Sequence, residues 1–350
     1  MQRHSRKLIE NLAAFAELDI TVIHPHEETV FPKVLGIKEV KIGDIDKDKT
    51  YLLELKRYSK RVHKVLTAGD FDVIYSQGFC VWDGIDDLAD KLIINPHGLE
   101  MFQTIGLKEK LMTAPFRQVF RQLFRKARYT VSLGGKLTGI IQDIVEDPDR
   151  IVVLSNAVDA PEEVSVKNGK REELKVLFVG RFAFNKGIDL LFDAAERINN
   201  EGGGNKFRFL FGGRGPLWKK YTDENRAANV ELLGFINDVR LKTLYEECDV
   251  FVLPTRFEGM PTVVLEAMAH AKPVIVSDTG ATAELVDGTN GWLVPVGSVD
   301  ALVEALRSAA GLKENELAAK GTASVMKVHE RFTWPIVAEA HLELFKRFVE

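Results

Sequence analysis

Two glutamates, Glu258 and Glu266, stand eight positions apart in the segment RFEGMPTVVLEAMAHAKPVIVSD. Carboxylates accept hydrogen bonds from hydroxyl groups, so each of these acids could hold a polyol. The apolar run VFVLP before Glu258 is typical of a buried parallel strand, and Pro261 is well tolerated in the first turn of a helix. The segment therefore predicts a strand, a glycine turn and a helix N-terminus between the two acids.

The start of this predicted helix suits an anion. The free N–H groups of Met260, Thr262 and Val263, which follow Gly259, would face the carboxyl edge of a sheet, where a helix N-terminus suits a diphosphate. A ligand with a charged middle and a polyol at each end, such as a nucleoside diphosphate sugar, fits this spacing. Two acids near a helix start are also common on solvated surfaces, and the spacing alone leaves that interpretation open.

A second segment places positive charge at the same edge. The sequence KVLFVGRFAFNKGIDLLFDAAERI, residues 175–198, predicts another strand, glycine turn and amphipathic helix, with Arg181 and Lys186 after the strand. Arginine can hold a phosphate as a fork and lysine as a point charge. Each cation alone is usually a surface charge, but together with the two glutamates they favour a diphosphate site.

The second half of the chain at this point resembles the retaining family 4 glycosyltransferases of GT-B fold, the glycosyl transferases group 1. The matching motifs follow the family's order: VGRFAFNKG (179–187), FGGRGPL (211–217), LGFINDV (233–239), EGMPTVVLEAMAHAKPVI (258–275) and NGWLVP (290–295). The resemblance implies an α/β chain of two Rossmann-like, doubly wound domains that face a cleft. The donor would bind the second domain and the acceptor the first, at the carboxyl ends of the strands.

The resemblance also implies roles for the four charged residues. Arg181 and Lys186 would hold the donor diphosphate, Glu266 would bind the ribose hydroxyls, and Glu258 would bind the transferred sugar. Positive charge and a helix start, the latter after Gly259, would stabilise the leaving diphosphate as its charge grows in the transition state. The resemblance therefore implies hexosyl transfer with retention at the anomeric carbon, with no metal and no cofactor besides the sugar-nucleotide co-substrate.

The resemblance also implies roles for three further residues. The segment around Phe235 and Ile236 corresponds to the one that supports the nucleobase. His97 in KLIINPHGLE ends a predicted strand, and the family has a histidine at the matching place that contacts the donor sugar and phosphate. A lone histidine is usually a structural hydrogen-bonding residue. The resemblance favours a functional one, which donates a hydrogen bond in the transition state.

Strand and helix patterns alternate along the whole chain, which predicts parallel sheets covered on both faces. The expected strands of the first half lie at 19–26, 72–78, 91–98, 129–134 and 150–158. A polar segment at 159–173 reads as a linker. The predicted domains are therefore 1–158, on the acceptor side, and 159–334, which binds the nucleotide sugar. A crossover helix at 335–350 would return to the first domain.

The beginning of the chain departs from the family pattern. Members open with a strand, a glycine-rich turn and a helix, whereas QRHSRKLIENLAAFAEL already has the pattern of that helix. Because the opening strand is central in a doubly wound domain, we expect an unfilled position in the first sheet. A fragment, a late start codon or another segment in that position would each explain the pattern, and activity would suffer.

Composition restricts the classes of function. The 350 residues suffice for two domains, and a hydrophobic share of 45% with 28% charged residues is typical of a globular protein. A net charge of -4 provides no general attraction for nucleic acid. No apolar run approaches the length of a membrane span, and two isolated cysteines predict neither disulfides nor zinc. We therefore expect a cytoplasmic protein.

The segment 106–129 interleaves apolar and basic residues. The apolar residues Met112, Phe116, Val119, Phe120, Leu123 and Phe124 interleave there with the basic residues Lys110, Arg117, Arg121, Arg125, Lys126 and Arg128. Such a helix can lie on an anionic membrane surface, which would suit a lipid-linked acceptor at the inner membrane face. Alternatively, the apolar stripe packs on the sheet and the basic residues are merely solvated.

These observations together predict a glycosyltransferase that moves a hexosyl group from a nucleoside diphosphate sugar to a glycan or lipid-linked acceptor in polysaccharide or glycoconjugate biosynthesis. Two alternatives remain at the level of sequence. A nucleotide-sugar epimerase shares the architecture but needs no acceptor, and an inactive sugar-nucleotide-binding fragment would bind the donor without transfer. The base, sugar, linkage, acceptor and oligomeric state have no signature in the sequence.

Overall fold

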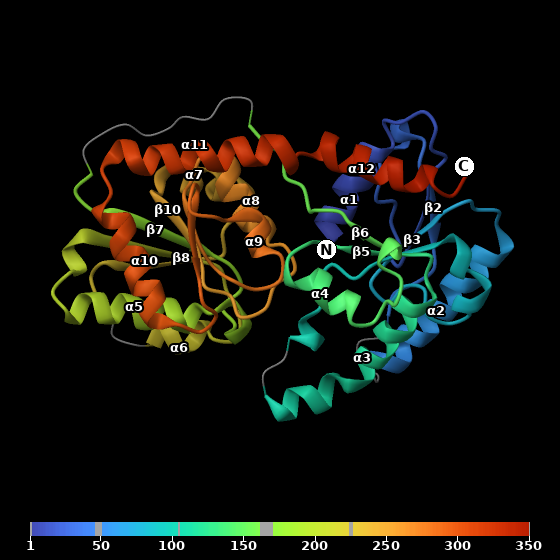
Figure 1. The fold of residues 1–350 in the computed structure, drawn as a ribbon, viewed down its shortest axis with the longest axis horizontal. Helices are drawn as coiled ribbons and strands as arrows, with labels where there is room; N and C mark the ends of the chain where they lie inside the picture. Colours follow the sequence, from blue (N-terminus) through green and yellow to red (C-terminus); the bar gives the residue numbers. More distant parts are fainter. Residues whose placement is uncertain (1, 46–50, 104–105, 162–170, 224–226, 350) are drawn as a thin grey trace. The chain divides into compact units, whose positions relative to one another are not determined.

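The computed structural model describes residues 2–45, 51–103, 106–161, 171–223 and 227–349. The chain divides into two compact units (Figure 1). Unit 1 comprises Met1–Asn156 and Trp334–Glu350, and unit 2 comprises Ala157–Thr333. The predicted linker at 159–173 lies largely outside the described residues.

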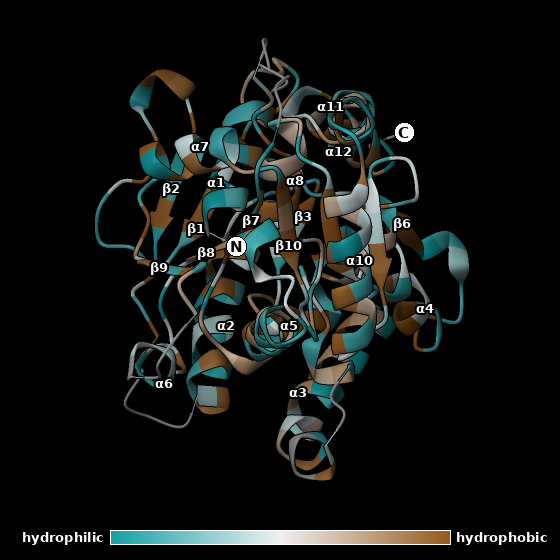
Figure 2. Cartoon of the chain, turned by 90° about the vertical axis from the view of Figure 1, so that its left-hand side faces the viewer, coloured by the Kyte–Doolittle hydropathy of each residue, from teal (hydrophilic) through white to brown (hydrophobic). Residues whose placement is uncertain are grey.

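Unit 2 is built on one parallel sheet of six strands in the order β12-β11-β10-β7-β8-β9. The central strands β10 and β11 are apolar runs buried on both faces, as expected for a parallel sheet, whereas the edge strands β9 and β12 are partly exposed. The strands are β7 (Leu174–Val179), β8 (Phe207–Gly212), β9 (Val230–Gly234), β10 (Val250–Leu253), β11 (Val274–Ser277) and β12 (Gly291–Val294). In Figure 2, β7 and β10 are drawn in the hydrophobic colour.

Helices cover both faces of this sheet. In Figure 1, α5 and α10 lie on one side, whereas α8 and α11 lie on the other. The helices of unit 2 are α5 (Ile188–Asn200), α6 (Trp218–Asp223), α7 (Asp238–Glu247), α8 (Thr262–Ala269), α9 (Thr282–Leu285), α10 (Val299–Gly311) and α11 (Glu314–Arg331). The strand order reverses between the neighbours β7 and β10, because the chain runs from β7 outward to β8 and from β10 outward to β11. Ligands of open α/β sheets bind at the carboxyl ends of the strands at such a switch point.

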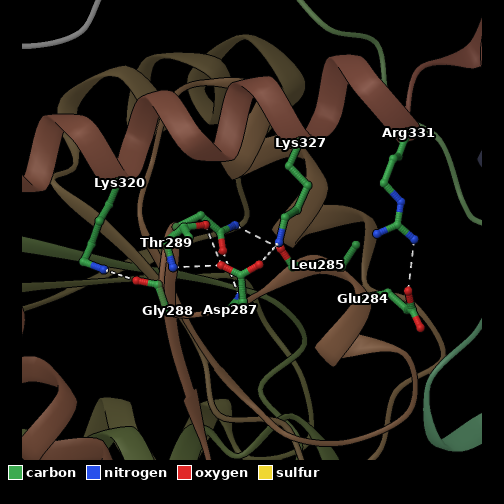
Figure 3. Close-up of polar contacts among 9 residues, drawn as sticks. Glu284, Leu285, Asp287, Gly288, Thr289, Lys320, Lys327 and Arg331 are labelled. Carbon is green, nitrogen blue, oxygen red and sulfur yellow. Dashed lines mark hydrogen bonds and ion pairs between the residues drawn. The ribbon is translucent and has the colours of Figure 1, made fainter.

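Three basic side chains on one face of the long helix α11 bond to other segments of unit 2 (Figure 3). Lys320 Nζ donates to the carbonyl of Gly288 at 2.6 Å, and Lys327 Nζ pairs with Asp287 at 2.6 Å. Arg331 pairs with a carboxylate of α9. The hydrogen bonds from Lys327 and Thr289 hold the pKa of the Asp287 carboxyl well below its usual range. This ion pair therefore persists through the neutral and mildly acidic range.

Unit 1 contains two parallel sheets. A four-stranded sheet has the order β3-β4-β5-β6, with β3 (Ile74–Gln77), β4 (Leu92–Asn95), β5 (Tyr129–Ser132) and β6 (Ile151–Val153). A separate pair consists of β1 (Thr21–His24) and β2 (Lys38–Lys41). Within the described ranges no strand joins β1 to β3, so the sheet of unit 1 is in two parts.

Strand β2 was not expected from the sequence. Its residues, KEVK, are charged at both ends and half-exposed or exposed, so the segment lacks the apolar run that marks the other strands. Polar contacts to neighbouring segments hold it: Lys38 pairs with Asp19 at 2.7 Å, and Glu39 bonds His24 at 2.9 Å. Long-range side-chain pairing here overrides a weak local preference for a strand.

Five helices complete unit 1: α1 (Gln2–Leu12), α2 (Tyr51–Ala68), α3 (Leu107–Lys126), α4 (Lys136–Gln142) and α12 (Trp334–Lys346). Helix α12 packs against α1 and against the sheet. Its buried Leu344 joins a core cluster with residues of β4 and β5, and the rings of Tyr75, Tyr129, Phe345 and Phe348 pack around that cluster. Each fully buried apolar side chain of this size stabilises the fold by about 1.5–3 kcal/mol, so α12 is an integral part of unit 1.

The chain passes from unit 2 to unit 1 over one residue, Thr333. Phe332 on one side of it is fully buried in unit 2, and Trp334 on the other side is buried in unit 1 beside His4, with ring centroids 5.0 Å apart. Thr333 forms a parallel bridge with Val158, whose N–H donates to the carbonyl of Phe332 at 2.9 Å.

Candidate active site

Two loops at the switch point of unit 2 pack backbone against backbone. The loop after β7 contains a short 3-10 turn, Phe184–Lys186, that ends at Gly187 with a φ of 65°. A Cβ atom on Gly187 would lie 1.8 Å from the carbonyl oxygen of Pro254 in the loop after β10, so only glycine fits both the conformation and the approach. Thr255 Oγ1 and Arg256 N both donate to the Asn185 carbonyl at 2.8 Å and fix the two loops together.

This packing brings two of the predicted residues into contact. Lys186 Nζ forms an ion pair with Glu258 Oε1, and the two side chains are only 23% and 14% exposed. A charged pair with so little exposure is attracted more strongly than one in water and needs its partner to offset the loss of solvation. The cation and the carboxylate are therefore held at the carboxyl ends of the adjacent strands β7 and β10.

Arg181 lies on the same loop, three residues before the 3-10 turn, and its side chain is exposed. Among the described residues, no carboxylate pairs with its guanidinium. Its backbone is nevertheless fixed, because Phe182 N donates to the Arg214 carbonyl at 3.1 Å and a Cβ atom on Gly213 would lie 1.9 Å from the Gly180 carbonyl oxygen. The exposed guanidinium therefore extends from a fixed backbone and can bind an anion.

Helix α8 begins at Thr262, and Pro261 is its N-cap. The residue before the N-cap, Met260, is buried. The first N–H groups of a helix, here those of Thr262 and Val263, have no partner within the helix by its geometry. The turn before it is packed against Gly280, where a Cβ atom would lie 2.1 Å from the Glu258 carbonyl oxygen. The predicted helix start is thus present, beside the ion pair of Lys186 and Glu258.

The turn is further fixed at Gly259, whose carbonyl oxygen accepts a hydrogen bond from Ala281 N at 2.8 Å. Glu266 lies one turn into α8 and is half-buried. The buried Tyr245 donates its hydroxyl to Glu266 Oε2 at 3.1 Å and also lies 3.2 Å from the Val263 carbonyl oxygen. Tyr245 orients the carboxylate that the sequence singles out, although no motif marks it.

The last two predicted donor residues follow β9. The Phe235 side chain is 78% exposed, and Ile236 packs so closely on β8 that a Cβ atom on Gly212 would lie 2.1 Å from its Cδ1 atom. Ile236 is therefore a fixed support, whereas the ring of Phe235 is free to stack on a planar group.

His97 follows β4 in unit 1, whereas the other predicted site residues belong to unit 2. Its φ of 58° is left-handed, which is uncommon for any residue other than glycine. The ring Nε2 atom bonds Gln77 Oε1, and the ring of His4 meets it edge-on with centroids 5.9 Å apart. Burial, aided by His4, lowers the pKa of His97 to about 3, so the ring is neutral at physiological pH.

The match to known sequences is concentrated in unit 2. Residues 173–311 match the family model described as Glycosyl transferases group 1. That range contains both loops of the switch point, helix α8 and the segment after β9. This part of unit 2 is therefore similar to the group 1 glycosyltransferases.

Two curated relatives belong to the same class. An uncharacterized glycosyltransferase of Methanocaldococcus jannaschii is 38% identical over 121 residues, which are 33% of this chain and 32% of the relative. A galactosyltransferase of Escherichia coli is 31% identical over 182 residues, 47% of this chain and 46% of the relative; its name specifies UDP-Gal and α-D-GlcNAc-diphosphoundecaprenol. The chain thus spans less than half the length of these two relatives.

Solved structures with a similar fold match nearly the whole chain, and not only unit 2. The sucrose-phosphate synthase structure from Thermosynechococcus elongatus is similar with a TM-score of 0.83 and 19% identity, over 99% of this chain and 93% of that one. The likeness establishes the GT-B fold, with two Rossmann-like α/β domains in one chain, as the sequence predicts.

Unit 2 contains a clamp that the sequence analysis missed. Arg256 forms two hydrogen bonds of 2.7 Å with the two carboxylate oxygens of Asp189, and its guanidinium lies 3.8 Å from the ring centroid of Phe184. Arg256 also donates to the Phe184 carbonyl at 2.7 Å. The clamp connects the loop after β10 to the 3-10 turn that carries Lys186. The one signal in the sequence for this clamp is the position of Arg256, two residues before Glu258.

The basic helix α3 has two different halves. Val119, Phe120, Leu123 and Phe124 are buried, so this part of the apolar stripe packs within unit 1, in agreement with the second interpretation. Met112 is exposed, together with Leu107 and Leu111, which the sequence analysis did not single out. An apolar end beside the exposed Lys110 is therefore presented to solvent. Throughout the described part of the chain, no helix is both long enough and apolar enough to cross a membrane.

Proposed function

We propose that this protein is a retaining glycosyltransferase that moves a hexosyl group from a nucleoside diphosphate sugar to a glycan or lipid-linked acceptor. The observation that carries the proposal is the ion pair of Lys186 and Glu258 at the switch point of unit 2, beside the start of α8. This arrangement supplies a cation and free N–H groups for a diphosphate and a carboxylate for sugar hydroxyls within one pair of loops.

Charge development drives the proposed reaction. As the bond from the anomeric carbon to the diphosphate opens, negative charge gathers on the phosphate oxygens and positive charge on the sugar ring. Lys186, Arg181 and the first N–H groups of α8 stabilise the leaving group more in the transition state than in the ground state. These cations make a metal unnecessary at this step. The neutral His97 ring has one N–H, on the Nε2 atom that bonds Gln77 Oε1 without a ligand, and in the proposed reaction this N–H turns from Gln77 to the donor sugar and phosphate.

The other residues hold the two ends of the donor. Glu258, which pairs with Lys186, accepts hydrogen bonds from the transferred sugar. Glu266, oriented by Tyr245, accepts from the ribose hydroxyls. The exposed ring of Phe235 covers one face of the base, and Ile236 supports it.

We infer a lipid-linked diphosphate acceptor and a site of action at the cytoplasmic membrane face. The Escherichia coli relative is named for such an acceptor, and the exposed apolar end of α3 suits contact with lipid. A triple change of Leu107, Leu111 and Met112 to serine tests the contact. Sedimentation with anionic vesicles should fall for this variant and not for Val34→Ser, another exposed apolar side chain. Equal sedimentation of both variants contradicts the contact.

The proposed donor site is tested by a thermal-shift screen against uridine, guanosine and adenosine diphosphate sugars, followed by transfer assays. A bound donor raises the melting temperature by mass action. Glu266→Ala should weaken donor binding, because it removes the ribose contact. No shift with any donor, or unchanged donor binding in Glu266→Ala, rejects the site. Conversion of the donor sugar without an acceptor would indicate an epimerase instead.

A further inference from the structure

A continuous chain of hydrogen bonds connects the His97 turn with the C-terminal helix α12. His97 N donates to Asn95 Oδ1 at 2.9 Å, and Asn95 Nδ2 donates to the Tyr75 hydroxyl at 2.7 Å. The Tyr75 hydroxyl lies 3.1 Å from His341 Nε2, and His341 Nδ1 lies 2.7 Å from the Val337 carbonyl oxygen. The chain thus spans from the end of β4, through β3, to α12.

Each bond in this chain has one possible direction. A backbone N–H can only donate, so the oxygen of the Asn95 amide faces His97 and its nitrogen faces Tyr75. A carbonyl can only accept, so His341 carries its proton on Nδ1 and presents a bare Nε2 to Tyr75. The Tyr75 hydroxyl accepts from Asn95 and donates to His341.

Burial makes this arrangement rigid. Asn95 and His341 are almost fully buried, and Tyr75 also packs edge-on against the rings of His341 and Phe345. Burial lowers the pKa of His341 to about 4, which keeps the ring neutral and its Nε2 atom an acceptor. A buried polar network with every member satisfied specifies one conformation, because any break leaves a buried group without a partner.

The His97 turn requires such support. Its left-handed backbone persists only where surrounding contacts determine it. Two contacts do so: Asn95 holds the backbone N–H, and Gln77, on the same strand as Tyr75, holds the ring. Of these contacts, the first depends on the amide orientation that Tyr75 and His341 enforce.

We propose that Tyr75 and His341 are positioning residues for His97, through which helix α12 sets the orientation of the imidazole for the transfer step. The inference rests on the proposed function, because it assigns to His97 a hydrogen bond in the transition state. The two positioning residues lie 266 positions apart in the chain and contact no proposed substrate group themselves.

The activity test is Tyr75→Phe, which removes one oxygen and leaves the ring in place. Tyr129→Phe is the matched control: Tyr129 lies on β5 of the same sheet, packs on Phe348 at the end of the same helical segment, and surrounds the same core cluster. Tyr75→Phe should lower kcat about tenfold with little change in the KM for donor, because the donor site lies in unit 2. Equal kinetics of the two variants overturn the inference.

A conservative variant separates positioning from folding. His341→Leu removes the acceptor for Tyr75 and should lower kcat as Tyr75→Phe does. His341→Gln retains an amide oxygen as acceptor and should recover a measurable part of that loss. Equal losses in the two His341 variants, at equal fractions of folded protein by circular dichroism, contradict a positioning role.

A spectroscopic readout makes the inference testable without turnover. In protein with 15N-labelled histidine at pH 7, His341 should be protonated on Nδ1 alone, and Tyr75→Phe should shift the ring signals of His97 whereas Tyr129→Phe should not. A His341 proton on Nε2, or unmoved His97 signals in Tyr75→Phe, overturns the inference. Absence of sugar transfer by the wild-type protein would instead count against the proposed function.

Discussion

The two units arrange their candidate residues by opposite means. In unit 2, charged side chains are paired with one another: Lys186 with Glu258, and Arg256 with Asp189, across loops joined backbone to backbone. In unit 1, the neutral His97 is held by a continuous series of hydrogen bonds that leads through Tyr75 to His341. The charged arrangement suits a ligand that carries its own charge, such as a diphosphate. The neutral one suits a group that donates a hydrogen bond without adding a charge.

The two arrangements also differ in how far apart their parts lie in the sequence. The loops of unit 2 come from two short segments that each contain several of the predicted residues. The support of His97 joins β3, β4 and α12, and its longest step spans 266 positions. Local motifs can therefore specify the first arrangement, whereas only the complete tertiary structure of unit 1 specifies the second.

The largest effect should follow from breaking the backbone contact in unit 2 with Gly187→Ala. Left-handed backbone and the overlap with the Pro254 carbonyl together should destabilise unit 2 by about 3 kcal/mol or more. Gly202→Ala is the control, because Gly202 has a φ of 80° with no atom within 4 Å of its added Cβ. It should lose only about 1–2 kcal/mol. Urea denaturation measures both, and equal losses would show that the loops do not depend on this contact.

Lys186→Ala tests whether the positive charge of this lysine contributes to the reaction. Loss of a cation that stabilises developing charge should lower kcat about 100-fold, with a smaller change in the KM for donor. Lys206→Ala provides the comparison, because Lys206 also ends a short 3-10 turn but is exposed. Steady-state kinetics distinguish the two. Wild-type kcat in Lys186→Ala would remove this lysine from the reaction.

Acid should affect unit 1 through its neutral histidines. Burial lowers the pKa of His4 and of His341 to about 4 in the folded state, from 6.5 in the unfolded state. Between these values the unfolded chain binds more protons, so the free energy of unfolding falls as pH drops from about 6.5 to about 4. For the two residues together we expect a loss on the order of a few kcal/mol.

Urea denaturation at pH 7, 5.5 and 4.5 measures this slope. The pKa of His270 in unit 2 is also lowered by burial, so a smaller slope is expected there. The Asp287 contribution has the opposite sign: the pKa of this carboxyl is depressed, so its stabilisation is present above about pH 4 and is lost only below it. A His341→Gln variant that keeps the full wild-type slope would contradict the assignment.

The smallest effect should come from Arg256→Lys. A lysine keeps the charge but cannot form the two parallel bonds to Asp189 or stack on Phe184, so the loop that carries Lys186 should loosen. Donor binding should weaken by a few-fold, on the order of 1 kcal/mol. Arg208→Lys at the exposed pair with Glu231 is the control and should change binding little. Calorimetric titration with the donor compares them, and identical affinities would exclude a role for the clamp.

The fold and the placement of the charged residues at the switch point could largely be predicted from the sequence, because apolar runs marked the buried strands and glycines marked their ends. Lys186 and Glu258 were expected at one sheet edge, and the structure places them in contact. The clamp of Arg256 and Asp189 could not be predicted, since nothing local distinguishes these residues from surface charges. Tyr245 reads in the sequence as an ordinary core residue of α7.

In unit 1 the sequence was less informative. Strand β2 has a charged pattern and is held by side-chain pairs, and the two halves of α3 look alike until packing separates buried Phe120 and Phe124 from exposed Met112. Tyr75, Asn95 and His341 carry no motif. Their importance depends on which atoms meet after folding, and that information is distributed over the whole unit.

The passage at Thr333 has a mechanical consequence. Since Phe332 is anchored in one unit and Trp334 in the other, torsion at this crossing is confined to the few backbone bonds around a single threonine. The bridge between Thr333 and Val158 adds a backbone contact on the unit 2 side of this crossing. A flexible insertion beside Thr333 would therefore lengthen the covalent link between these two anchored side chains.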